Sequence, residues 1–356
     1  MEFLTDYGLF LAKTITIVVA IGAVIGLMVA AGQRAKGAEK GHIEVTRLND
    51  DYEEMQNALK EAVLDQYALK EDAKTRKKKE KEETSAKKKA AKAHKGETPG
   101  SESTKKRVFV LNYHGDLRAS ATANLRQEIT AILSLAKASD EVLVRLESGG
   151  GMVHSYGLAS SQLARITAKE IPLTISVDKV AASGGYMMAC VADKILAAPF
   201  AVVGSIGVVA QLPNFHRLLK KNDIDFELIT AGDHKRTLTM FGENTDEDRE
   251  KFVEDIEDTH ELFKEFVAEH RPSVDIPMVA TGEVWFGRRA LQRNLVDELK
   301  TSDEYITSLV DSADIFEVTY HHKKTIPEKL GLIAQEATDR LLMTWWQRFQ
   351  SSRWLS

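Results

Sequence analysis

The sequence predicts an α/β domain with largely parallel strands, preceded by one transmembrane helix and a charged segment. From Arg107 onward, short runs rich in β-branched residues alternate with stretches of helical period. Buried apolar strands separated by helices are typical of parallel sheets. Upstream, residues 14–31 carry no charge, and about 20 apolar residues are enough for a helix to cross a bilayer. A membrane-anchored α/β protein is therefore expected.

The amino terminus is expected to comprise a short tail, residues 1–9, and an uncleaved membrane anchor, residues 10–33. Lys13 interrupts the apolar run near its start, where its long side chain can reach the interface. A cleaved signal peptide and a buried core helix are the alternatives. A signal peptide would begin with basic residues, whereas this chain begins with Glu2 and Asp6. A core helix would rarely be apolar on every side, so the anchor is the favoured interpretation.

Residues 34–70 are expected to form a juxtamembrane amphipathic or coiled-coil helix. Apolar or near-apolar residues recur there at alternating spacings of four and three, at Leu48, Tyr52, Met55, Leu59, Ala62, Gln66 and Leu69. Such a stripe fits a short coiled coil between protomers or a helix lying on its own domain, and the sequence does not decide between them.

Two further segments flank the main domain, which is expected at residues 107–325. Residues 71–106 are rich in lysine and poor in large apolar residues, so they are expected to be a solvated linker that can also contact anionic lipid. Residues 326–356 are expected to form an amphipathic helix whose apolar face carries Trp345 and Trp346. Such a helix can lie in a lipid interface or dock on another subunit.

Composition excludes one class of partner and one kind of nucleophile. The formal net charge is −5, which gives no reason to expect a nucleic-acid partner. Cys190 is the one cysteine and lies in an apolar run. It cannot form an internal disulfide, and it is expected to be a small buried hydrophobic residue rather than a reactive thiolate.

Within the main domain, the pattern predicts five strands and one long helix. The strands are expected at residues 107–113, 141–146, 172–177, 194–197 and 206–210. The helix is expected at residues 121–138, between the first two strands.

Ser183 is the candidate nucleophile. It lies among alanines and glycines, between a predicted strand and an apolar helical run. Small neighbours permit a tight turn that exposes the hydroxyl, and the amino end of a helix offers N–H groups to an oxyanion. A glycine loop, residues 147–151, follows another strand, and its glycines let the backbone approach a substrate carbonyl. Together, at strand ends of one domain, the two motifs indicate a nucleophilic serine site.

A serine hydroxyl needs a base, and the residues alone leave several candidates. The G-x-S-x-G pattern followed by an acid and a histidine fails, because Ala181 occupies the first glycine position. The histidines downstream of Ser183 lie among polar neighbours and have no distinguishing context. A lysine can replace histidine where burial disfavours the charged form. Lys235 is one such lysine, although its loop could equally be an ordinary polar loop.

Five segments match the motifs of a known family in their order and spacing: residues 145–151, 182–186, 203–208, 231–235 and 287–297. On these segments the chain resembles the protease IV / signal peptide peptidase A family of serine peptidases. The similarity extends over roughly residues 108–299, and the anchor with its charged segment resembles a bacterial inner-membrane branch of that family.

The resemblance implies a fold of the Clp protease/crotonase type, with repeated ββα units, and a Ser-Lys dyad. Ser183 would be the nucleophile and Lys235 the general base, with Ser205 orienting the lysine. No metal or cofactor is implied. Substrates would be unfolded, signal-peptide or membrane-derived polypeptides. Because members of the family oligomerise, a homo-oligomer that completes each site between neighbours is expected.

The resemblance also implies an oxyanion hole formed by the Gly184 N–H and by the glycine loop, through Gly150 or Gly151. The loop departs from the family's usual N-S-P-G-G, because Glu147 replaces the asparagine and Gly149 the proline. This departure puts the loop's rigidity and the substrate preference in question more than the chemistry.

Two rival functions remain open. A crotonase-type acyl-CoA enzyme would use the same glycine loop but would work through carboxylate groups in its pocket. A non-catalytic membrane scaffold would assemble through the stripe at residues 48–69 and the carboxyl-terminal helix.

The bacterial inner membrane is the expected location, with the side of the catalytic domain open. The positive-inside rule places the body in the cytoplasm, because basic residues follow the span at Arg34, Lys36, Lys40 and Arg47. The family resemblance favours the periplasm instead.

Overall fold

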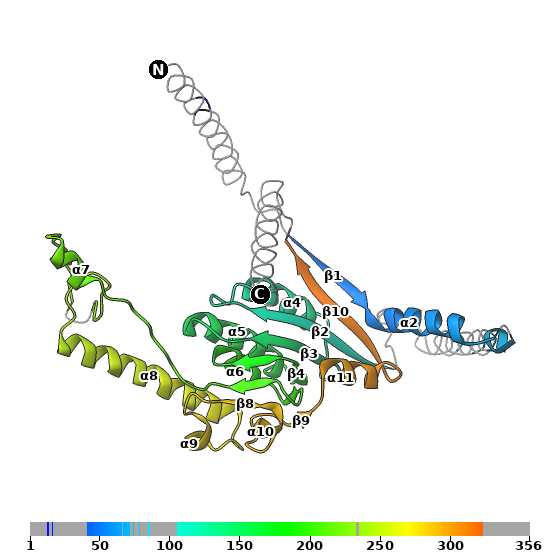
Figure 1. The fold of residues 1–356 in the computed structure, drawn as a ribbon. Coiled ribbons are helices and arrows are strands. Elements are labelled where there is room, and N and C mark those ends of the chain that lie inside the picture. Colours follow the sequence, from blue (N-terminus) through cyan, green and yellow to red (C-terminus); the bar gives the residue numbers. More distant parts are fainter. Residues whose placement is uncertain are drawn as a thin grey trace, which may run out of the picture. The chain divides into compact units, whose positions relative to one another are not determined.

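The computed structural model describes residues 41–65, 67–71, 105–232 and 235–322, with single residues at positions 13, 16, 74, 78 and 85 (Figure 1). Residues Ile43–Tyr320 belong to one compact unit, which holds the candidate site. Among the described residues, no helix is both long and apolar enough to span a bilayer. The expected anchor at 10–33 and the expected carboxyl-terminal helix at 326–356 lie outside the described residues, as does most of the expected linker.

The described strands form one ten-stranded sheet in which most neighbours run parallel, which confirms the predicted α/β class (Figure 1). Its main path runs in the order β1-β10-β2-β3-β4-β6-β9. These strands are β1 (His42–Arg47), β2 (Lys106–Gly115), β3 (Glu141–Ser148), β4 (Leu173–Val177), β6 (Lys194–Ala197), β9 (Glu298–Leu299) and β10 (Ala313–His321). Four of the five predicted strands thus appear, as β2, β3, β4 and β6.

A short branch of the sheet carries the candidate site. β5 (Val180–Ala182) pairs with the end of β3 and with β7 (Val202–Gly204), and β7 pairs antiparallel with β8 (Val284–Phe286). The prediction of a strand at residues 206–210 is wrong, because the strand in this part of the chain is β7 and ends at Gly204. Positive φ values of 104° at Gly204 and 53° at Ser205 end that strand before residue 206.

Side chains alternate between the two faces of the sheet, and helices cover both. One face packs Phe109, Leu111 and Tyr113 against α4 (Thr122–Leu133), α5 (Val153–Thr167) and α6 (Gly184–Ala189). The other packs Val108 and Val110 against α11 (Ser302–Leu309). The helix predicted at 121–138 is α4, which ends five residues earlier than expected.

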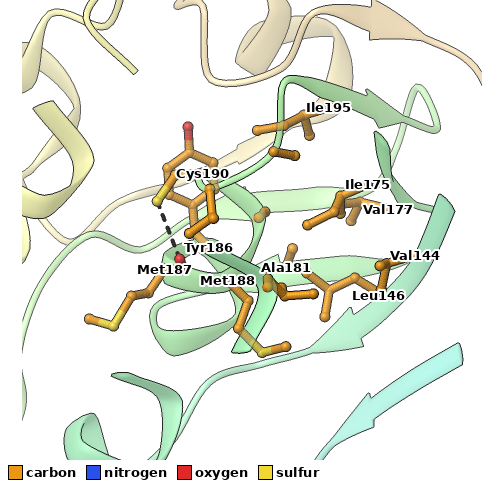
Figure 2. Close-up of a cluster of buried hydrophobic side chains, with 14 of the residues drawn as sticks. Val144, Leu146, Ile175, Val177, Ala181, Tyr186, Met187, Met188, Cys190 and Ile195 are labelled. Atoms are coloured by element: carbon orange, nitrogen blue, oxygen red, sulfur yellow. Dashed lines mark hydrogen bonds between the residues drawn. The ribbon is translucent and has the colours of Figure 1, made fainter. Parts of the chain in front are cut away.

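The helix α6 is entirely buried, which fixes the segment that follows the candidate nucleophile. Figure 2 shows Tyr186 and Met188 of α6, and Cys190 directly after it, in the apolar cluster that also holds Ala181 of β5 and Leu146 of β3. Burial raises the pKa of the Cys190 thiol, and its Sγ donates to the Met187 carbonyl at 3.3 Å. The prediction that Cys190 is a buried hydrophobic residue is therefore confirmed.

Part of the segment predicted to be a juxtamembrane helix, residues 34–70, forms α2 (Leu48–Val63), whereas His42–Arg47 of that segment form β1 and pair into the sheet. The first turn of α2 docks on the domain. The Asn49 amide donates to the carbonyls of Val310 and Ala313 at 2.9 Å each, and its oxygen accepts from the Ile315 N–H at 2.8 Å. Further along, Leu59 is 67% exposed. The helix therefore lies on its own domain at its start, and a coiled coil between protomers stays a prediction for the remainder.

A separate excursion, residues 208–244, leaves the sheet after β7 and is called the arm below. It contains α7 (His216–Lys221) and leads into α8 (Asp246–His270), which runs back toward the sheet (Figure 1). Stacking of Phe215 on Phe241 and contact of Phe226 with Phe241 hold the arm together. Among the described residues, every hydrogen bond of the arm joins two arm residues.

The region beyond α8 is held to the sheet by an ion pair whose arginine is buried. It includes α9 (Ile276–Val279) and α10 (Gly287–Leu291). The Arg271 guanidinium, 7% exposed, donates to both carboxylate oxygens of Asp297 at 2.9 and 2.6 Å. The same carboxylate accepts from the Ile195 N–H of β6 at 2.7 Å. Arg271 therefore joins the end of α8 to the sheet.

Replacing Arg271 by Met is expected to lower the free energy of unfolding by about 3 kcal/mol, because Asp297 would lose the partner that compensates its partial burial. Chemical denaturation of the wild type and the variant measures this difference as a shift in midpoint. Arg249→Met is the matched control, since Arg249 pairs with Asp246 at 56% and 96% side-chain exposure. A loss below about 1 kcal/mol, as expected for the exposed pair, would contradict a structural role for Arg271.

Candidate active site

Ser183 lies in a tight turn between β5 and α6, as predicted from its small neighbours. Its backbone has φ 53° and ψ −121°, which is strained for a residue with a Cβ. The Ser183 N–H donates to the Gly204 carbonyl at 2.8 Å, which ties the turn to the end of β7. The residue is only partly buried.

Ser205 occupies the equivalent position on the neighbouring strand. Ala182 and Gly204 are partners in the β5–β7 register, so Ser183 and Ser205 each follow a paired strand end. Ser205 has the same φ of 53°, and its N–H donates to the Glu283 carbonyl at 2.7 Å. The fold therefore places two strained serines next to each other, directly after the carboxyl ends of β5 and β7.

The glycine loop contacts the Ser183 turn directly. Gly150 has φ 87°, and a Cβ there would lie 2.7 Å from both the Ala182 oxygen and the Gly184 nitrogen and 2.8 Å from the Ser183 Cβ. Such distances are far below van der Waals contact, so only glycine fits. Gly151 likewise packs against the Leu117 carbonyl. The predicted loop, nucleophile and helix start are therefore brought together by the fold.

The loop's amides are not equivalent as oxyanion donors. The Gly150 N–H already donates to the Ser148 Oγ at 3.1 Å. Among the described residues, the Gly151 and Gly184 N–H groups donate no hydrogen bond to the protein. Of the three predicted donors, Gly184 and Gly151 therefore have amides available for a substrate oxygen.

The residue that departs from the family pattern, Glu147, forms a link between strands. Its carboxylate accepts from the Lys179 Nζ at 3.2 and 3.0 Å, just before β5. His114, its register partner on β2, lies 3.7 Å away through Nδ1. This contact ties the end of β3 to the strand that leads to Ser183, and so restrains the loop from its amino-terminal side.

Lys235 lies on the arm and is exposed. Its backbone N–H donates to the Gly232 carbonyl at 3.2 Å. Within the described part of one chain, no hydrogen bond or ion pair joins Lys235 to Ser183 or Ser205. The fold thus brings together five of the six predicted site residues and leaves the predicted base on a separate segment.

Two buried residues next to the site had no role in the sequence prediction. Ser148, the last residue of β3, is 1% exposed, and Tyr156 of α5 is fully buried. Their hydroxyl oxygens lie 2.6 Å apart. The position of Ser148 in the glycine-loop motif was the available signal, whereas nothing in the sequence singled out Tyr156. As for metal binding, no group of three or more His, Cys, Asp or Glu side chains among the described residues could hold an ion.

Comparison with known proteins gives consistent similarities. The family model "Peptidase family S49 N-terminal" matches residues 2–163, and "Peptidase family S49" matches residues 165–315. The chain is 49% identical over 341 residues to "Probable protease SohB" of Haemophilus influenzae, covering 96% of each chain. It is also 49% identical over 308 residues to "Probable protease SohB" of Buchnera aphidicola subsp. Schlechtendalia chinensis, covering 86% of this chain and 100% of the relative.

Solved structures are matched more distantly. A lysine-to-alanine mutant of a membrane-bound stomatin-specific protease, in complex with a substrate peptide, aligns with 13% identity and a TM-score of 0.40. That alignment covers 64% of this chain and 97% of the other.

Proposed function

The chain belongs to peptidase family S49, and we propose that it is a serine endopeptidase with Ser183 as nucleophile and Lys235 as general base. One observation carries the assignment of the nucleophile. Ser183 lies in a strained, partly exposed turn against the Gly150 backbone, next to the N–H groups of Gly184 and Gly151, which donate no hydrogen bond among the described residues. That combination suits attack on a peptide carbonyl.

In the proposed mechanism, Lys235 accepts the Ser183 proton as the hydroxyl attacks the substrate carbonyl. The N–H groups of Gly184 and Gly151 hold the oxyanion, and Ser205 orients the lysine. The lysine then protonates the leaving amine, and water hydrolyses the acyl-enzyme. No step requires a metal or a cofactor.

The exposed arm supports a site completed between protomers. Lys235 is exposed in one chain, whereas a lysine that acts as a base needs an environment that disfavours its charge. The arm also exposes large apolar side chains, including Val209 at 80% and Ile229 at 90%. Apolar surface of this kind is typical of subunit contacts. We therefore propose a homo-oligomer in which the arm carries Lys235 to the Ser183 of a neighbour.

The proposal extends to the membrane and the substrates. Residues 10–33 would anchor the chain in the bacterial inner membrane as a single span, and the tryptophan-rich helix at 326–356 would give a second lipid contact. Substrates would be unfolded, signal-peptide or membrane-derived polypeptides. The apolar span in the sequence supports the anchor.

Ser183→Ala and Lys235→Ala are each expected to lower cleavage of unfolded casein by about 10⁴-fold or more, because nucleophile and base act as a unit. Only chains that retain Ser183 should incorporate a fluorophosphonate probe. Ser161→Ala and Lys220→Ala, which change exposed residues of α5 and the arm, are the matched controls and should cleave at the wild-type rate. Equal cleavage by the wild type and both site variants would contradict the proposed dyad.

A further inference from the structure

A directional chain of hydrogen bonds runs from the glycine loop into the core. The Gly150 N–H donates to the Ser148 Oγ at 3.1 Å. The Ser148 Oγ and the Tyr156 Oη lie 2.6 Å apart, and the Tyr156 Oη donates to the Asp116 carbonyl at 2.8 Å. Four residues, from the segment after β2, from β3, from the loop and from α5, are thus linked in series.

The direction of every bond in this chain is determined. A tyrosine hydroxyl has one hydrogen, and the Asp116 carbonyl can only accept it. The Tyr156 oxygen must therefore accept from Ser148, whose oxygen in turn accepts from Gly150. Burial raises the pKa of Tyr156, so the hydroxyl keeps the proton that this arrangement needs.

The Tyr156 ring also supports the other half of the proposed oxyanion hole. A Cβ on Gly184 would overlap the ring Cγ and lie 2.8 Å from its Cδ2. The next residue, Gly185, packs its Cα against the Ser148 carbonyl in the same way. The start of α6 therefore rests on the same two residues that hold the loop.

We propose that Tyr156 is a positioning residue that aligns both halves of the oxyanion hole, with its ring under Gly184 and its hydroxyl acting on Gly150 through Ser148. This inference rests on the proposed function of Ser183 as nucleophile. Gly149, Gly150 and Gly151 have no side chains with which to fix the loop, and glycine has the largest backbone freedom to lose. A buried hydroxyl pair supplies the restraint that the proline of the family pattern would otherwise give.

Tyr156→Phe is expected to lower kcat by about 10- to 100-fold and to leave KM within about twofold, because an oxyanion donor acts mainly in the transition state. The inhibition constant of a peptide aldehyde, whose adduct with Ser183 places an oxyanion in the hole, should rise by the same factor. Ser148→Ala should have a similar effect, and the double variant should lose little more than either single variant, since both interrupt one chain.

Tyr113→Phe is the matched control. Tyr113 is also a core tyrosine, 1% exposed, and its hydroxyl lies 3.2 Å from the Thr122 Oγ1 and is not a member of the chain that reaches Gly150. Removal of the Tyr113 hydroxyl should change the thermal stability of the protein but not kcat or the affinity for the aldehyde. Wild-type kcat and aldehyde affinity in Tyr156→Phe would overturn the proposal, and so would an equal loss of kcat in Tyr113→Phe.

Hydrogen exchange separates this proposal from the proposed function. Amides of residues 149–151 should exchange at least about tenfold faster in Tyr156→Phe than in the wild type, because the Gly150 bond weakens. The same comparison in a Ser183→Ala background needs no catalysis. Unchanged exchange in both backgrounds would overturn the positioning role. If the wild type proves inactive but exchange is still faster in Tyr156→Phe, the positioning role is supported and the Ser-Lys assignment alone is rejected.

Discussion

A 1:1 mixture of Ser183→Ala and Lys235→Ala chains, each inactive alone, should recover about a quarter of wild-type activity after subunit exchange, as random assembly of a closed ring with shared sites requires. Under the proposed sharing, a working site needs Ser183 from one chain and Lys235 from its neighbour. Each condition is met with a probability of one half, so the fraction follows from their product. Casein cleavage by the mixed oligomer, refolded from denaturant or produced by co-expression, measures it.

The control for this mixture is the Ser183→Ala/Lys235→Ala double variant mixed with the wild type. Under sharing between neighbours, that mixture should also retain about a quarter of full activity, whereas sites complete within one chain would retain about a half, as independent protomers do. Lack of recovery in the first mixture, in oligomers shown by differential tagging to contain both chains, would contradict sharing. The exposure of Lys235 and the apolar surface of the arm are the reasons to expect recovery.

Most of the sheet could be predicted because its central strands are long apolar runs. β2, β3, β4 and β6 are buried on both faces, and such strands are recognisable in a single sequence. The edge and branch strands could not be predicted in this way. β5, β7 and β8 each have three residues, which is too short for any periodicity to show.

The tight turn at Ser183 and the glycine loop were predictable from local chemistry, since glycine and small residues indicate tight backbone turns. The assignment of 206–210 as a strand failed for a related reason. Ser205 adopts φ 53° although it is not glycine, and no residue type signals such strain in advance. Lys235 could be proposed as the base only through the order of the motifs, because it lies on a separate segment from Ser183.

Contacts between segments that are far apart in the chain could not be predicted from the sequence. The Asn49 side chain docks α2 through backbone groups more than 250 residues away, and Tyr156 reaches the loop only because α5 packs beneath it. Asn49 is one of many polar residues of α2 and belongs to a residue type that is mostly exposed, whereas tyrosine is intermediate, so neither residue type predicts a buried hydrogen-bonding role. Tertiary hydrogen bonds satisfy them instead, which only the folded chain reveals.

Gly150→Ala is expected to lower kcat/KM by about 10²- to 10³-fold, the loss typical of removing a single oxyanion donor, while the fold is retained, if the loop forms the proposed oxyanion hole. The added Cβ would meet the Ala182 oxygen and the Gly184 nitrogen at 2.7 Å and the Ser183 Cβ at 2.8 Å. Relief of these contacts requires the loop to move away from Ser183, which separates the two donors that must hold one oxygen.

The neighbouring residue provides the control within the same loop. A Cβ on Gly149 would meet no atom within 4 Å, and Gly149 does not have a positive φ. Gly149→Ala should therefore keep kcat/KM within about threefold of the wild type, because ordinary surface substitutions have small effects. Steady-state cleavage of a fluorogenic peptide gives both values, and circular dichroism with thermal melting verifies that each variant folds. A folded Gly150→Ala chain with near-wild-type activity would show that the loop does not contact the reacting carbonyl, and the oxyanion hole would then have to be formed elsewhere.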